Sequence, residues 1–98
     1  MILVTGTILA KTETLDELLA LSLEHVRRSR TEPGCVMHRV HQDAENPLRL
    51  VIVEEWTDKA ALAAHFVVPG SREFVKTAME LADAAPVINI YEATKVEM

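Results

Sequence analysis

The sequence has little of several residue types on which whole classes of function depend. Its single cysteine, Cys35, excludes an internal disulfide and is typical of a reducing compartment. Its three glycines, Gly6, Gly34 and Gly70, lie far apart, so the chain has no glycine-rich phosphate loop and no dinucleotide fingerprint for flavin or NAD. Basic residues gather only at 27–30, and a net charge of -5 makes a nucleic acid an unfavourable partner.

Long hydrophobic runs are also missing. The apolar segment at residues 2–9 is far shorter than a membrane span, and it lacks the basic region and cleavage site of a signal peptide. We therefore expect a cytoplasmic protein with no membrane partner. The length of 98 residues, with 49% hydrophobic and 26% charged residues, predicts one globular domain over residues 1–98.

Hydrophobic periodicity and helix-breaking residues predict a β-α-β-β-α-α-β order. Thr14 and Glu17 are spaced as a capping box that would begin the first helix, and Pro33-Gly34 ends it. Asp58 caps a short second helix that reaches about Phe66. The predicted strands cover residues 2–9, 35–42, 48–57 and 87–94.

A third helix is predicted between Ser71, as its N-cap, and Pro86. Its predicted inward stripe consists of Phe74, Val75, Ala78, Leu81 and Ala82. The order of elements indicates a ferredoxin-like α+β fold, with a four-stranded antiparallel sheet and helices on one face.

Two predicted strands are apolar on both faces, in the segments 50–53 and 87–90. An antiparallel sheet with one wet face would alternate apolar and polar residues instead. Because the helices of one chain can cover only one face, we expect a homodimer joined through the other face. The residues expected to meet there are Val51, Val53, Ile88 and Ile90.

Period-2 alternation places polar residues among apolar ones on one face of each later strand. Val36, His38 and Val40 share a face, as do Leu50, Ile52, Glu54 and Trp56, and as do Val87, Asn89 and Tyr91. If these faces point at the helices, the polar residues converge on one apolar cavity, which His65 would join from the second helix. An apolar cleft with a few polar groups is the usual form of a small-molecule site. The candidate site residues are His38, Glu54, Trp56, His65, Asn89 and Tyr91.

Each candidate also has a structural interpretation. Asn89 and Tyr91 could simply satisfy the hydrogen bonds of the sheet edge or of each other. His38 and His65 could be core histidines with satisfied hydrogen bonds, and Trp56 a core residue. Glu54, once buried, could form an ion pair with Arg30 or Arg39 instead of serving a reaction.

No metal site is expected from local spacing. His38 and His41 lie three residues apart on a strand, so their rings point to opposite faces, and no other cluster has ligand spacing. We therefore expect no metal, haem or flavin cofactor.

Three segments together resemble the antibiotic biosynthesis monooxygenase superfamily, in particular its small quinol monooxygenase-like members. They are the turn Glu32-Pro33-Gly34-Cys35, the strand ending in Glu54-Glu55-Trp56 and the short helix ending in Ala64-His65, all within residues 30–66. The resemblance implies a dimeric α/β barrel, with two subunits packed sheet against sheet.

The resemblance also implies a cofactor-free reaction of molecular oxygen with a phenolic or quinol substrate. His65 corresponds to the family's helix histidine and would act as the base. Trp56 and Tyr91 would enclose the aromatic ring, and Glu54 or Asn89 would orient it.

The chain departs from relatives at one notable position, and two other classes of function stay open. Many relatives carry a second histidine directly before the phenylalanine of the following helix, where this chain has Glu73 before Phe74. The haem-degrading branch carries an asparagine on its first strand, where this chain offers Thr5-Gly6-Thr7. An isomerase of a small polar metabolite would need cationic groups in the cavity, and a binding module would show no turnover.

Overall fold

The protein, described over residues 1–98 by a computed structural model, has seven elements in the predicted order. They are β1 (Ile2–Leu9), α1 (Leu15–Ser29), β2 (Cys35–Gln42), β3 (Arg49–Trp56), α2 (Lys59–Val67), α3 (Pro69–Leu81) and β4 (Val87–Glu92). The last strand ends at Glu92 instead of at residue 94.

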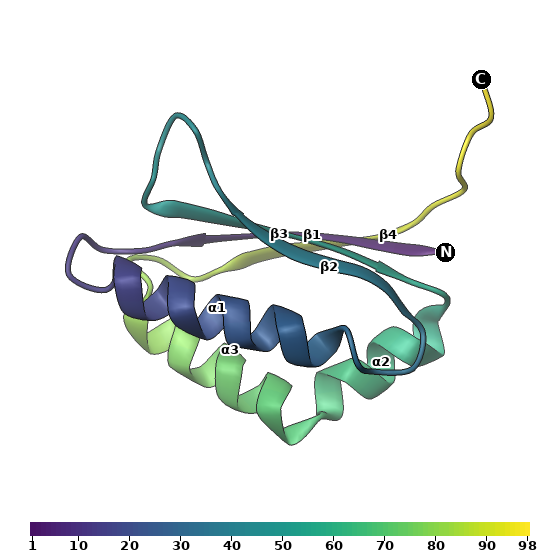
Figure 1. The fold of residues 1–98 in the computed structure, drawn as a ribbon, viewed down its shortest axis with the longest axis horizontal. Helices are drawn as coiled ribbons and strands as arrows, with labels where there is room; N and C mark the ends of the chain where they lie inside the picture. The colour runs from purple at the N-terminus through teal and green to yellow at the C-terminus, as the bar shows by residue number, and fades with distance from the viewer.

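The four strands form one antiparallel sheet in the order β2-β3-β1-β4, and all three helices lie on one side of it (Figure 1). This is the predicted ferredoxin-like α+β arrangement. The opposite face carries no helix, and both the β2–β3 loop and the C-terminal tail project on that side (Figure 1). None of the three helices combines the length and the apolar composition that a membrane crossing would require.

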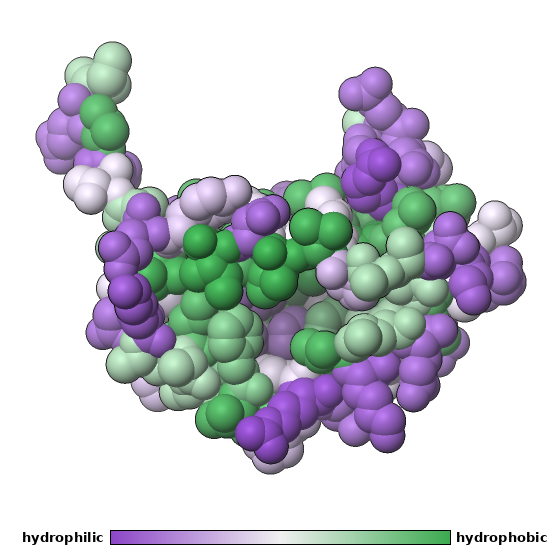
Figure 2. All heavy atoms as spheres, turned by 180° about the vertical axis from the view of Figure 1, so that it is seen from behind, coloured by the Kyte–Doolittle hydropathy of each residue, from purple (hydrophilic) through white to green (hydrophobic).

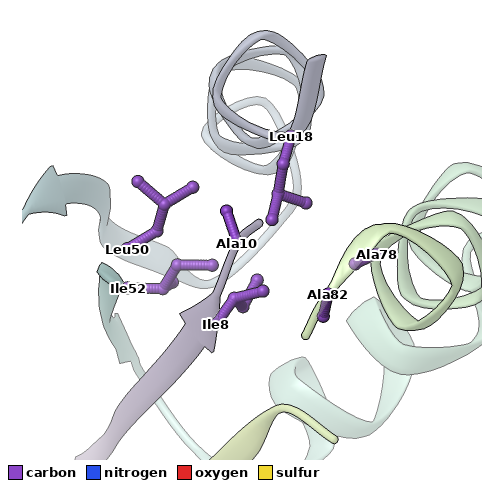
Figure 3. Close-up of a cluster of buried hydrophobic side chains, with 7 residues drawn as sticks. All are labelled: Ile8, Ala10, Leu18, Leu50, Ile52, Ala78 and Ala82. Atoms are coloured by element: carbon purple, nitrogen blue, oxygen red, sulfur yellow. The ribbon is translucent and has the colours of Figure 1, made fainter. Parts of the chain in front are cut away.

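The main hydrophobic core lies between the sheet and helices α1 and α3 (Figure 3). Leu18 of α1 is fully buried, which stabilises the fold by about 2 kcal/mol. Small residues at Ala78 and Ala82 let α3 come close to the sheet, and Ala82 bridges Ala10 beyond the end of β1. A second cluster, beside the polar residues described below, consists of Ile2, Val4, Trp56 and Leu62.

The predicted capping box at the start of α1 is wrong. The Thr14 hydroxyl accepts the Lys11 N–H at 3.0 Å and donates to the Leu81 carbonyl at 2.8 Å, so it ties the start of α1 to the end of α3. It makes no bond to the amide of Glu17. The predicted cap of α2 is confirmed, because Asp58 Oδ1 accepts the Ala61 N–H at 2.8 Å.

Helix α3 begins three residues earlier than predicted. Val68 is extended and separates α2 from α3, whose first residue is Pro69, a position where a missing N–H has no cost. Ser71 is therefore inside the helix and is not its N-cap. Val75, predicted to face the core, is 54% exposed.

A β-bulge shifts the start of β2. The pairing with β3 changes register between Cys35 and Met37, which leaves Val36 as the extra residue, with 57% of its surface exposed. The prediction that Val36 faces the helices is therefore wrong, while His38 keeps the inward face. Just before the bulge, Gly34 has a φ of 83°, which favours glycine.

The side chains of β4 point in the opposite directions from those assumed in the dimer prediction. Residues directly opposite each other in an antiparallel pair share a face. Ile88 and Ile90 lie opposite Gly6 and Val4, so they point to the helix side. The prediction that they face the open side of the sheet is therefore wrong. All six residues of this edge strand are exposed, because no helix covers it.

Candidate active site

The site begins with a row of residues across the inward face of the sheet. His38 of β2 lies opposite Glu54 of β3, and both are buried. His38 Nε2 is 3.3 Å from Glu54 Oε1, and the Trp56 indole Nε1–H donates to the same oxygen at 2.8 Å. Neither ring nitrogen of His38 has a well-aligned hydrogen bond, so its contact with Glu54 is electrostatic.

Glu54 stays ionised although it is buried. Burial acts to raise its pKa, but the His38 ring, the Trp56 indole and the positive charge that His65 carries when protonated together outweigh that effect and hold the pKa below its ordinary value. The alternative partners Arg30 and Arg39 are not used: Arg30 Nε donates to the His38 carbonyl at 3.0 Å, and Arg39 is exposed. The alternative interpretation, in which Glu54 forms an ion pair with one of these arginines, is therefore wrong.

His65 approaches the same carboxylate from α2. Its Nε2 is 4.0 Å from Glu54 Oε1, and its Nδ1 is 2.7 Å from Oε1 of Glu32, in the turn between α1 and β2. Because an ionised carboxylate only accepts, Nδ1 carries the hydrogen, and Nε2 of the neutral ring keeps its lone pair. That turn packs tightly on α2, since a Cβ at Gly34 would lie 2.5 Å from Ala61 Cβ.

His25 is a site residue that the sequence analysis missed. It lies on α1, and its ring centroid is 5.2 Å from that of His38 and 5.3 Å from that of His65. It also stacks on Phe74 of α3 at 4.1 Å. The available signal was helical spacing, because the buried residues of α1 include Leu18, Ser22, His25 and Ser29, which recur every three or four residues.

Arg28 fixes the protonation state of His25. Its guanidinium lies 2.6 Å from His25 Nδ1, and since a guanidinium can only donate, that nitrogen must accept. Burial is the main reason that the pKa of His25 falls to about 3, and the pKa is lowered further by the positive charges that His38 and His65 carry when protonated and by the guanidinium of Arg28. His25 is therefore neutral at physiological pH, with its hydrogen on Nε2.

A cavity of about 250 Å³ lies beside this cluster, between α3 and the sheet. His25, Glu54 and His65 line it, together with Thr7 and Ser71, and it has no lysine or arginine. Gly6 contributes no side chain to its wall, which leaves room above the sheet. The apolar residues of the wall include Ile8, Ile52, Phe66, Phe74, Ala78 and Ile88. Seen from behind, hydrophobic side chains surround a hollow between sheet and helices (Figure 2).

A second hollow, of about 310 Å³, reaches His65 from the opposite side. Glu32, Gly34 and Ala61 line it, so the Glu32–His65 pair lies between two openings. The side chain of Glu32 keeps 13% of its surface exposed, whereas that of His65 keeps 3%. A proton on His65 can therefore reach solvent through Glu32 without crossing the first cavity.

Comparison with known proteins identifies the family. The sequence profile of the antibiotic biosynthesis monooxygenase family matches residues 1–77. The chain belongs to this family.

Relatives extend the match beyond the profile. An uncharacterized protein of Synechocystis is 32% identical over 96 residues, which is 98% of this chain but only 65% of the relative. A crystal structure of a Deinococcus radiodurans protein that carries the family's name superposes with a TM-score of 0.94 at 26% identity, covering 100% of this chain and 97% of the other. The crystal structure of a conserved protein of Methanosarcina mazei superposes with a TM-score of 0.90 at 30% identity, and the match covers 95% of this chain and 92% of the other.

Within this antibiotic biosynthesis monooxygenase fold, four of the six predicted site residues come together. Glu54 and His65 line the cavity. His38 and Trp56 lie behind them and are fully buried. The Trp56 ring packs against that of His65, with ring centroids 4.6 Å apart, and it does not line the cavity. The aromatic wall is formed by Phe66 and Phe74 instead.

The other two predicted residues lie elsewhere. Asn89 and Tyr91 are opposite Thr5 and Leu3, so they point to the open face of the sheet, away from the histidines. The expectation that they join the cavity is therefore wrong. The period-2 rule places alternate residues correctly, but a strand with apolar residues on both faces does not indicate which set points inward.

Proposed function

We propose that the protein is a cofactor-independent monooxygenase that oxidises a phenolic or quinol-type aromatic substrate with molecular oxygen. The observation that carries this proposal is the Glu32–His65 pair, which presents a lone pair on Nε2 beside an apolar cavity. Family membership supports an oxygenase, and the absence of cationic residues from the cavity wall argues against an isomerase of a polar metabolite.

The proposed reaction needs no external reductant. A phenol gives its proton to Nε2 of His65, and the phenolate then reduces oxygen by one electron. The resulting radicals join through a new carbon–oxygen bond. The oxygen–oxygen bond of that peroxide then breaks, so one oxygen atom stays as a quinone carbonyl and the other leaves as water with the ring hydrogen and the phenol proton. The substrate supplies all four electrons.

The remaining residues have distinct proposed tasks. Glu32 keeps His65 in the tautomer with a basic Nε2 and offers the proton a route to solvent. His25, neutral with its hydrogen on Nε2, can donate to the phenolate oxygen as charge develops. Phe66 and Phe74 would hold the ring in surroundings from which water is excluded.

Oxygen uptake with a panel of hydroquinones and naphthalene diols tests the activity. With isotope-labelled oxygen gas, one labelled atom should enter the product and one should enter water. Gly6→Val, which would fill the cavity from the sheet side, should reduce uptake strongly, whereas the exposed His41→Gln should not. Binding of quinols without any enzyme-dependent oxygen uptake would instead indicate a binding module.

A homodimer through the open sheet face is also proposed. Val51, Val53, Val87 and Tyr91 lie on that face or at its edge, where they would form an apolar patch in water. The β2–β3 loop and the C-terminal tail project from the same side, where they could flank a second copy (Figure 1).

Val53→Glu is expected to convert the dimer to monomers, because it would place two symmetry-related carboxylates in an apolar interface. Sedimentation equilibrium at micromolar concentration would measure the change. Lys76→Gln, on the exposed side of α3, is the matched control, because it lowers the net charge by the same one unit, and it should leave the dimer intact. A wild-type protein that sediments only as a monomer contradicts the proposal.

A further inference from the structure

The structure assigns a second role to the polar cluster. We propose that Nε2 of His38, Oε1 of Glu54 and Nε2 of His65 form a binding site for a divalent transition-metal ion, of which zinc is the natural example. We further propose that a bound ion inhibits the oxygenase. The inhibition rests on the function proposed above, whereas the metal binding does not.

The ligand atoms are already close to a coordination geometry. Glu54 Oε1 lies 3.3 Å from His38 Nε2 and 4.0 Å from His65 Nε2. In a tetrahedral site with bonds of about 2.0–2.1 Å, neighbouring ligand atoms lie about 3.3 Å apart. The first distance needs no change, and the second needs to shorten by less than 1 Å, which a small rotation of the His65 ring provides.

The surroundings of the three ligands favour a metal ion. His38 is 1% exposed, yet neither of its ring nitrogens has a hydrogen-bond partner. An ion would satisfy one of these nitrogens. His65 donates its other ring N–H to the Glu32 carboxylate, which is the usual outer-sphere partner of a metal-binding histidine. Trp56 holds the Glu54 carboxylate in place through Oε1.

His25 lies close enough to be a fourth ligand but is prevented from acting as one. The three histidines have ligand atoms within 4.8 Å of one another. However, Arg28 donates to His25 Nδ1, so the hydrogen of His25 is on Nε2, and that nitrogen has no lone pair to offer. Two imidazoles and one carboxylate therefore remain, and such a three-ligand site leaves a coordination position open.

Metal binding and proton abstraction need the same electron pair. In the proposed oxygenase, Nε2 of His65 takes the substrate proton, and a metal ion on that nitrogen removes its basicity. The ion would therefore act as a reversible inhibitor and not as a resident cofactor. The metal ion would therefore take no part in the reaction, although it binds the residue that acts as the base.

Cobalt(II) titration of chelator-treated protein tests the binding. We expect one cobalt ion per chain, with the visible absorption of a four-coordinate nitrogen–oxygen site and without the intense band of a cobalt–thiolate bond. His38→Gln and His65→Gln should each weaken binding at least about tenfold. Cys35→Ser and His41→Gln are controls that should leave the affinity unchanged. Binding that is unchanged in both histidine variants, or no binding at all, overturns the proposal.

Two further measurements do not depend on the folding of those variants. X-ray absorption of the cobalt-loaded wild type should reveal two imidazole ligands, and a site without imidazole overturns the assignment. Arg28→Met removes the donor to His25 and should tighten cobalt binding about tenfold or more by adding a third imidazole. An unchanged affinity in this variant would show that Arg28 does not exclude His25.

The inhibition is tested separately with zinc and a responsive quinol. Zinc should abolish oxygen uptake at the concentration that fills the site, and a chelator should restore it. Full oxygen uptake by the zinc-loaded protein would overturn the inhibition and also the role of His65 as base, while leaving the metal site intact. Absence of turnover with every quinol would instead count against the proposed function alone.

Discussion

Replacing His65 with glutamine is expected to lower oxygen uptake with a responsive quinol by about two to four orders of magnitude, the usual effect of removing a general base. This corresponds to about 3–5 kcal/mol in the activation free energy. Glutamine can still donate an amide N–H to Glu32, but it offers no basic nitrogen to the substrate. Steady-state oxygen uptake, measured as kcat and KM for both proteins, tests the prediction.

Glutamine is the informative substitution because His65 is both a proposed base and a packed residue. Alanine would leave the Glu32 carboxylate without its partner and a void against Trp56, whose ring lies 4.6 Å from that of His65. Loss of activity would then be confounded with loss of stability. Ser71→Ala, which removes only a weak 3.4 Å contact to His65 Nδ1, is the matched control and should retain most activity. Near-normal turnover in His65→Gln would show that His65 is structural.

Acidification is expected to destabilise the protein before its carboxylates titrate. The pKa of His25 is about 3 in the folded protein, against 6.5 without the fold. Between these values the unfolded chain binds a proton that the folded protein does not, so stability falls as the pH falls. Between about pH 7.5 and 4.5, the free energy of unfolding should decrease by roughly 2–3 kcal/mol from His25 alone.

Urea unfolding at a series of pH values measures this dependence. Below pH 4.5 the depressed pKa of Glu54 adds to the loss, because Glu54 then binds a proton in the unfolded chain while it is still ionised in the folded protein. His25→Gln should flatten the profile between pH 7.5 and 4.5, since glutamine does not titrate. The exposed His41→Gln should leave the profile unchanged. A flat wild-type profile over this range would mean that His25 does not have a lowered pKa.

Local sequence patterns were sufficient to predict the order of helices and strands, but not every helix cap or side-chain direction. The cap at Asp58 was predicted correctly because its partner, the Ala61 N–H, is three residues away. The role of Thr14 was not predicted correctly, because its shortest hydrogen bond is to the carbonyl of Leu81, 67 residues later. Similarly, Val36 was assigned to the wrong face because a bulge against β3 decides its direction.

Two of the six predicted site residues depended on information that periodicity does not contain. Alternation along β3 correctly placed Glu54 and Trp56 on the face of Leu50 and Ile52, since the helices bury that face alone. Strand β4 is exposed on both faces, so its apolar residues gave no direction, and Asn89 and Tyr91 were assigned to the wrong side. The register of β4 with β1 decides which of its residues point to the helices.

The sequence by itself determined the family, the order of the elements, the ferredoxin-like fold and the sheet-facing position of His65 on the second helix, because periods of 2 and 3.6 residues and short motifs are local properties. Only the tertiary structure decided which residues share the site. His25, His38, Glu54 and His65 come from α1, β2, β3 and α2, and their rings and carboxylate meet only when the helices pack on the sheet. Likewise, the lowered pKa of His25 arises from burial and from charges that lie near it only in the folded chain.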